Sequence, residues 1–201
     1  MDQHTIDNTI KYYNENANHY YMNTVDIDMS TIYEIFLNHI PERCGILDVG
    51  CGSGRDSKAF IDKGYKVTSI DASRELCVLA SKLLGIEVLN LNVLDLKYNS
   101  EFDAIWACAS LLHISRDKQY EAFGRLVNAL KINGIIYMSY KYGSVDTFDG
   151  YRFFCNQTTE SIKELVGHFN NIEIRNIWMS DDQKDNSSDK WLNILCEKIR
   201  I

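Results

Sequence analysis

Residues 44–54 read CGILDVGCGSG, a short apolar run that ends in three closely spaced glycines. The apolar part, residues 44–49, predicts a buried β-strand, and the residues from Arg55 onward predict a helix that is closed by Gly64. Glycine lets a backbone turn tightly and approach a ligand, because it has no Cβ atom. Ligands of open α/β sheets bind at the carboxyl ends of the strands, so this turn is predicted to hold a cofactor.

The spacing of the glycines separates this turn from two common nucleotide sites. Gly50, Gly52 and Gly54 read G-x-G-x-G, and Arg55 stands where a dinucleotide-binding turn has its third glycine. A P-loop would need a Gly-Lys-Ser/Thr run, which is absent. The next predicted strand ends in Asp71, whose carboxylate can accept hydrogen bonds from both hydroxyls of a ribose; a helix-capping role is the alternative.

Strands and helices continue to alternate along the chain. The sequence predicts further strands at 65–71, 86–93, 102–109 and 134–142 and helices at 55–63, 73–84 and 117–130. This order predicts a parallel sheet with helices on both faces, in which the apolar run 102–109 is central. A turn at Asn133-Gly134 is expected before the last of these strands.

Both ends of the chain depart from this alternation. Residues 6–21 and 29–40 are predicted to be helical, and residues 143–157 are predicted to be a loop. A helix over 158–169 precedes two strands, 172–179 and 191–200, which a polar run joins as an antiparallel pair. The fold is therefore predicted to be α/β, a Rossmann-like seven-stranded mostly parallel sheet with a C-terminal antiparallel hairpin and helices on both faces.

Composition narrows the class of protein. The 201 residues include 21 Lys plus Arg and 28 Asp plus Glu, a net charge of −7, which disfavours nucleic acid as a partner without excluding a small basic site. The length predicts one domain over 1–201.

Six widely spaced cysteines and scattered histidines predict free thiols and no metal site. With no signal-peptide pattern and no membrane-length apolar run, we expect a soluble cytoplasmic protein; no pattern indicates an oligomeric state.

Several stretches resemble the class I S-adenosylmethionine-dependent methyltransferases: ILDVGCGSGRDSKAF, GYKVTSIDAS, LNVLDL and FDAIWACASLLHI. Three further stretches are similar to the small stand-alone branch that includes tellurite-resistance-type and ubiquinone-biosynthesis-type enzymes. They are YYNENANHYY near the start of the sequence, GRD after the glycine turn, and SYKYG in the fifth predicted strand. The resemblance implies S-adenosylmethionine as the cofactor, S-adenosylhomocysteine as the product, and a helical lid over residues 1–40.

The resemblance also implies a set of cofactor-binding residues. The set comprises Asp48, Gly50, Cys51, Gly52 and Gly54 for the methionine part, Arg55 for its carboxylate, Asp71 for the ribose, Ala72, Asn92 and Val93 for the adenine, the backbone of Ala107 for the methionine amino group, and Tyr13 and Tyr20 of the lid. Many relatives have an aspartate where Asn92 stands, and the asparagine oxygen can accept the same hydrogen bond. A solvated Arg55 and a purely packing role for the two tyrosines are the alternatives.

Methyl transfer from a sulfonium is an in-line displacement that needs an aligned acceptor, exclusion of water and, for a protonated acceptor, removal of a proton. The acceptor pocket is expected after the fourth and fifth strands. His113, Tyr140, Tyr142 and Arg152 are the predicted substrate-binding residues, and His113 and Tyr140 are the catalytic candidates. The unperturbed pKa of histidine, near 6.5, would suit His113 as a base, and pocket-lining and structural roles are the alternatives. A surface position is the alternative for Arg152.

The sequence thus predicts methyl transfer to a small-molecule acceptor. Methylation of RNA or protein is one alternative, although the N/D-P-P-Y motif and an appended basic module are absent. A non-catalytic, cofactor-binding partner subunit is the other, and the intact glycine turn and Asp71 argue against it.

Overall fold

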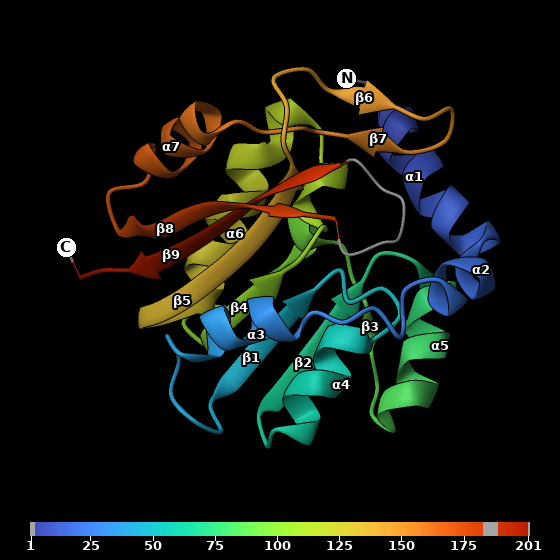
Figure 1. Cartoon of the computed structure of the whole chain (residues 1–201), viewed down its shortest axis with the longest axis horizontal. Helices are drawn as coiled ribbons and strands as arrows, with labels where there is room; N and C mark the ends of the chain where they lie inside the picture. The colour runs from blue at the N-terminus through green and yellow to red at the C-terminus, as the bar shows by residue number, and fades with distance from the viewer. Residues whose placement is uncertain (1–2, 183–188, 201) are drawn as a thin grey trace.

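The structure, a computed structural model, describes residues 3–182 and 189–200, and in these residues seven strands form one sheet in the order β3-β2-β1-β4-β5-β9-β8 (Figure 1). Its strands are β1 (Gly45–Val49), β2 (Lys66–Asp71), β3 (Leu89–Asn90), β4 (Phe102–Ala107), β5 (Leu130–Lys141), β8 (Ile172–Asp181) and β9 (Lys190–Lys198). The first five pair in parallel, and β9 runs antiparallel to both β5 and β8. The predicted fold class is confirmed, and β4 is the central strand.

Helices cover both faces of the sheet (Figure 1). They are α1 (Gln3–Glu15), α2 (Ala17–Met22), α3 (Ser30–Leu37), α4 (Arg55–Asp62), α5 (Arg74–Leu84), α6 (Gln119–Ala129) and α7 (Thr159–Gly167). Apolar side chains of α3 and α4 pack on one face, whereas those of α6 and α7 pack on the other. The side chain of Ser73 caps α5, and Thr158 caps α7 in a capping box with Ser161.

Three predicted elements differ in the structure. The helix expected over 6–21 breaks at Asn16, whose side-chain amide donates to the carbonyl of Tyr12 and competes with the helical pattern. The third strand is short, because the side chain of Asn92 starts a 3₁₀ turn by accepting from the N–H of Leu94. The loop over 143–157 contains a small hairpin, β6 (Thr147–Phe148) with β7 (Phe153–Phe154).

The expected turn at Asn133-Gly134 lies inside β5 as a bulge. Phe102 of β4 pairs with Leu130, but Ala104, two residues on, pairs with Ile135. The extra residues of β5 are accommodated by Asn133, which has a φ of 64°. A Cβ atom on Gly134 would lie 2.7 Å from the Leu130 side chain and 2.9 Å from a backbone carbonyl, so the bulge requires glycine.

We expect Gly134→Ala to lower the free energy of unfolding by about 1–3 kcal/mol, because the added methyl group has no space in the bulge. Urea unfolding followed by circular dichroism measures the change. Gly167→Ala is the matched control, since no atom lies within 4 Å of its added methyl group. A Gly134→Ala protein as stable as the wild type would contradict this account of the bulge.

Candidate active site

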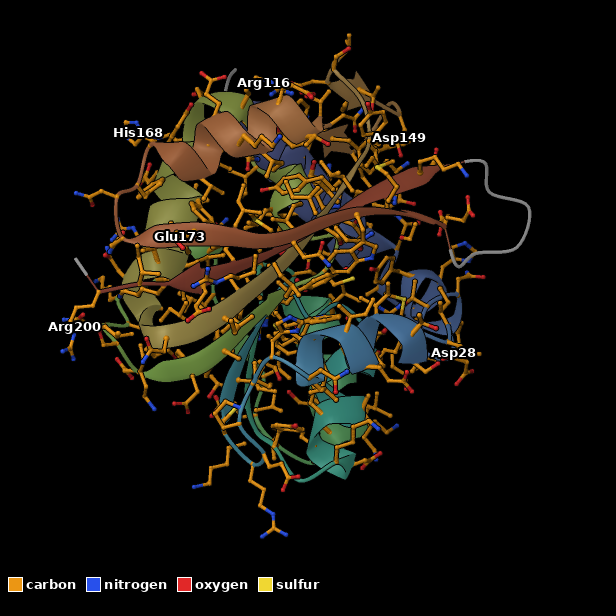
Figure 2. The ribbon with its side chains drawn as sticks, turned by 60° about the vertical axis from the view of Figure 1, so that its left-hand side comes forward. Asp28, Arg116, Asp149, His168, Glu173 and Arg200 are labelled. Atoms are coloured by element: carbon orange, nitrogen blue, oxygen red, sulfur yellow. The ribbon has the colours of Figure 1, made fainter. Side chains whose placement is uncertain are left out.

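Buried carboxylates gather where β1 and β2 end. Many charged side chains lie at the surface, and Figure 2 shows Asp28 and Arg200 at the outer edge of the molecule. By contrast, Asp48, Asp56 and Asp71 are only 1%, 6% and 9% exposed. Burying a carboxylate is costly unless hydrogen bonds compensate it, so such a cluster at the carboxyl ends of parallel strands marks a candidate site.

The glycine turn between β1 and α4 has an unusual backbone. Gly50, Gly52 and Gly54 have φ values of 72°, 56° and 82°. A Cβ atom at Gly50 would lie 2.3 Å from the hydroxyl of Ser110, and one at Gly52 would lie 3.1 Å from the ring of Tyr20. Gly54 instead packs against α5. The lack of a Cβ atom at Gly50 and Gly52 therefore lets other groups approach the backbone closely, and at Gly54 it lets α5 pack against the turn.

The carboxylate of Asp71 joins the glycine turn to α5. One oxygen accepts from the N–H of Gly52 at 2.9 Å, and the other accepts from the N–H of Ser73 at 2.8 Å. Burial raises the pKa of Asp71. Each carboxylate oxygen can accept a second hydrogen bond, so these contacts leave capacity for hydroxyl groups.

Asp71 lines a cavity of about 100 Å³. The structure brings predicted residues from three segments together there: Asp71 and Ala72 after β2, Asn92 and Val93 after β3, and Tyr13 and Tyr20 from the N-terminal helices. The oxygen of Asn92 accepts from the N–H of Leu94 at 3.0 Å, so an adenine contact through that oxygen would be its second bond.

A second cavity, of about 400 Å³, adjoins the first one. Both are lined by Tyr13, Tyr20, Gly50, Ala109 and His113. The second cavity extends past Cys51 and Arg55 toward the ends of β5 and β9. Two connected spaces that meet at the glycine turn suit a long cofactor in one and part of the other, with a second molecule beside it.

Asp48 lies beneath the glycine turn. Its carboxylate accepts from the hydroxyl of Ser57 at 2.5 Å. Burial, reinforced by the negative charge of Asp56, raises the pKa of Asp48 well above its usual range. A cationic group placed nearby would favour the ionised form of Asp48, as an amino group of the cofactor could.

The backbone of Ala107, at the end of β4, is the predicted contact of the methionine amino group, and the structure does not test that contact. Ala107 is fully buried in β4 and lines neither cavity, whereas Cys108 and Ala109 line the second one. Ala109 has a φ of 49°, and its N–H donates to the hydroxyl of Ser139 at 2.9 Å. Such a conformation is uncommon outside glycine and is often found at functional sites.

The structure also does not bring Tyr140 or Tyr142 to a cavity. Tyr140 is fully buried in the core, where its hydroxyl donates to Gln119 at 2.9 Å, and Tyr142 is 50% exposed. Side chains alternate along a strand, so the opposite face of β5 borders the second cavity with Tyr137, Ser139 and Lys141. Lys141 is therefore a cavity residue that the sequence analysis did not select.

His113 connects the N-terminal helices to the body of the protein. Its Nδ1 lies 2.8 Å from the carbonyl oxygen of Phe153, which can only accept, so Nδ1 carries the proton. Its Nε2 then accepts from the hydroxyl of Tyr13 at 2.8 Å. Burial lowers the pKa of His113 to about 4. A neutral imidazole with an occupied lone pair favours a positioning role over base catalysis.

Arg152 lines the second cavity. Its guanidinium lies 4.8 Å from the ring centre of Tyr12 and 5.2 Å from that of Phe154, and Asp149 accepts its hydrogen bonds. Lys141 lies 4.7 Å from the same Phe154 ring and forms an ion pair with Asp189. Two cations thus border this wall of the cavity.

The sequence analysis did not single out the remaining residues of the second cavity. They include Thr24, Ile27, Met29 and Ile32 from the N-terminal segment and Ser180, Asp181, Asp182, Trp191 and Asn193 from the C-terminal hairpin. The residues of the hairpin reach the site through the pairing of β9 with β5, which no local motif encodes.

Comparison with known proteins agrees with this geometry. Residues 46–134 match the family described as a methyltransferase domain. The ubiquinone biosynthesis O-methyltransferase of Rickettsia canadensis (strain McKiel) is 31% identical over 99 residues, which is 47% of this chain and 41% of that protein.

Solved structures share the fold at low identity. The 1,6-didemethyltoxoflavin-N1-methyltransferase of Burkholderia thailandensis, solved with 1,6-didemethyltoxoflavin and S-adenosylhomocysteine, has a TM-score of 0.76 at 18% identity and covers 97% of this chain and 87% of its own. The [4+2]-cyclase SpnF also has a TM-score of 0.76, at 15% identity, with 97% of each chain covered.

Residues 46–134 thus resemble a methyltransferase domain, and the chain shares its fold with solved S-adenosylmethionine-dependent methyltransferases. The site fits S-adenosylmethionine, because a glycine turn without Cβ atoms, the buried carboxylate of Asp71 and the guanidinium of Arg55 lie at the end of β1. The chain spans about two fifths of the length of most of the curated relatives that it matches. Across the described residues, no helix combines the length and the apolar character that a membrane crossing requires.

We expect Asp71→Ala to weaken the binding of S-adenosylhomocysteine at least tenfold. If Asp71 binds the ribose as the sequence predicts, the substitution removes two buried charge-assisted hydrogen bonds to the ribose hydroxyls, each worth about 1.5–3 kcal/mol. Isothermal titration calorimetry measures the change. Asp62→Ala, on the exposed side of α4, should bind as the wild type does. An unchanged dissociation constant in Asp71→Ala would limit Asp71 to its bonds with the backbone.

The pKa of His113 predicts a dependence of stability on pH. The unfolded chain takes up a proton on this histidine near pH 6.5, but the folded chain does so only near pH 4. The stability contributed by neutral His113 is therefore fully present above about pH 6.5 and is lost as the pH falls toward 4. We expect His113→Gln to flatten the decline in the free energy of unfolding over this range by up to about 1.4 kcal/mol per pH unit.

Urea unfolding at several pH values measures this slope. His39→Gln, at an exposed position just after α3, is the control and should keep the slope of the wild type. The same slope in His113→Gln would mean that His113 titrates normally in the folded protein.

Proposed function

We propose that this chain transfers the methyl group of S-adenosylmethionine to a small-molecule acceptor that binds in the second cavity. One observation carries the proposal: the two cavities meet at Tyr13 and His113, beside the glycine turn. This arrangement supports a cofactor that spans the meeting point and an acceptor that approaches from the second cavity. The volume of about 400 Å³ suits a small molecule next to the methionine part.

The residues of the chain have distinct roles in this proposal. When bound, the cofactor supplies a methyl group that its positively charged sulfur has already activated. Asp71 accepts hydrogen bonds from the ribose, Arg55 faces the methionine carboxylate, and the turn at Gly50 and Gly52 lets the backbone approach closely. Alignment of two molecules in this way can supply about 7–11 kcal/mol of barrier reduction.

The N-terminal helices serve as a lid in this proposal, as the sequence predicts for residues 1–40. Two contacts support the idea: Tyr20 lies against Gly52, and Tyr13 donates to His113. Figure 1 shows α1 beside β7, and the N–H of Phe153 in β7 donates to the hydroxyl of Thr9 in α1 at 3.2 Å. Closed in this position, the two tyrosines keep water from the place where the methyl group is transferred.

The wall of the second cavity supports a polar acceptor. Lys141 and Arg152 offer N–H donors, and Trp191 and Phe154 offer apolar surface. His113 positions Tyr13 and lines the acceptor space, and acceptors that ionise without help need no base in the protein. The N-terminal segment and the C-terminal hairpin both line the second cavity, so it suits a small molecule better than a segment of RNA or protein.

The reaction can be tested directly. We expect the protein to convert S-adenosylmethionine to S-adenosylhomocysteine when it is incubated with a panel of small oxygen, nitrogen and sulfur nucleophiles. Mass spectrometry detects S-adenosylhomocysteine and the methylated acceptor. Gly52→Val should abolish cofactor binding, because its branched side chain would meet Tyr20 and the φ of 56° is strained for valine.

Two outcomes would contradict the proposal. Normal cofactor binding by Gly52→Val would show that the turn does not hold the cofactor. Cofactor binding by the wild type without methyl transfer to any acceptor class, including RNA and protein, would favour a non-transferring role. A cyclase with a similar fold shows that such a departure can occur.

A further inference from the structure

The buried carboxylate of Asp56 accepts four hydrogen bonds. One oxygen accepts from the hydroxyl of Tyr33 at 2.5 Å and from Nε of Arg55 at 2.6 Å. The other accepts from Nε1 of Trp106 at 2.8 Å and from Nη2 of Arg55 at 3.0 Å. A carboxylate has about four acceptor sites, so Asp56 is saturated and held from α3, α4 and β4 at once.

This arrangement fixes the guanidinium of Arg55. A bidentate contact through Nε and Nη2 uses one edge of the planar group and leaves three of its five N–H donors for other partners. Arg55 has a side chain that is 18% exposed, and it lines the second cavity together with Cys51 and Ser53 of the glycine turn. The unused donors belong to a group whose orientation is already set.

We propose that Asp56, assisted by Tyr33 and Trp106, is a positioning residue that presents Arg55 to the carboxylate of the cofactor's methionine part. The proposal rests on the proposed function, since it takes S-adenosylmethionine as the ligand. Arginine in a fixed plane recognises a carboxylate through two parallel hydrogen bonds, which a freely rotating side chain does less well. Tyr33 makes helix α3 part of the cofactor site through a single hydroxyl.

Two simpler roles for Asp56 make different predictions. If Asp56 only neutralised Arg55, its removal would strengthen the attraction of Arg55 for an anionic ligand. If the ion pair only stabilised the fold, its loss would affect all ligands of the site equally. A buried ion pair is on average no more stabilising than apolar residues of similar volume, so stability alone explains its presence poorly.

Two ligands that differ only in the amino-acid part separate these roles. S-adenosylhomocysteine and 5′-methylthioadenosine share the adenosine and the sulfur, but the second lacks the amino and carboxylate groups. We expect Arg55→Gln to weaken S-adenosylhomocysteine about tenfold or more in calorimetry and to change 5′-methylthioadenosine less than about twofold. Arg74→Gln, at an exposed position at the start of α5, should change neither affinity.

The positioning role is tested on the partners of Arg55. Asp56→Asn and Tyr33→Phe should each weaken S-adenosylhomocysteine, by about tenfold and about threefold, and should leave 5′-methylthioadenosine unchanged. Tyr33→Phe removes one hydroxyl and keeps the aromatic ring, so it decides the question if Asp56→Asn does not fold.

Three results would overturn the proposal. Tighter binding of S-adenosylhomocysteine by Asp56→Asn would mean that Asp56 only neutralises Arg55, and equal weakening of both ligands would mean that the network is only structural. If the wild type binds both ligands and every variant keeps their affinity ratio, the positioning role fails while the proposed function stands. If the wild type binds neither ligand, both fail.

Discussion

The carboxylate of Asp71 is the constraint on which the site depends. It ties the backbone of the glycine turn after β1 to the first turn of the helix after β2. The neighbouring parallel strands bring Val49 and Ile70 into register, so both connections begin side by side. Gly50, Gly52 and Gly54 all have positive φ, and ordering them in isolation would cost conformational entropy. The hydrogen bonds of Asp71 hold this turn in one conformation. The position of Tyr20 over Gly52 depends on that conformation.

The three buried carboxylates at this edge have different partners. Asp48 accepts from a serine hydroxyl, Asp56 accepts from an arginine and two aromatic side chains, and Asp71 accepts from two backbone N–H groups. Apolar side chains of similar size would fill the same volume without the cost of burying charge. The cluster is therefore better explained by a ligand with amino, carboxylate and hydroxyl groups than by the stability of the sheet.

Local patterns in the sequence predict most of this architecture. A glycine turn between an apolar strand and a helix depends on neighbouring residues alone, so the positions of Asp48, Gly52 and Arg55 follow from the chain itself. Asp71 and Ala72 end the next strand and are predicted for the same reason. The antiparallel arrangement of β8 and β9 also follows from a polar connection too short for a crossover helix, although residues 183–188 of that connection lie outside the described part of the chain.

The acceptor side depends on contacts that no local pattern contains. Tyr137 to Tyr140 are all buried, so the period of two in β5 groups alternate residues but does not tell which group borders a cavity. The pairing with β9 determines which face of β5 borders the cavity, because β9 brings Trp191 and Asn193 to the face that carries Ser139 and Lys141.

The low pKa of His113 has a similar origin, because its burial depends on Tyr13 and Phe153, residues far from it in sequence. The glycine turn is thus encoded by one local motif, whereas the second cavity, the proposed acceptor side, arises from pairing between distant segments. Substrate specificity could therefore change there without altering the glycine turn.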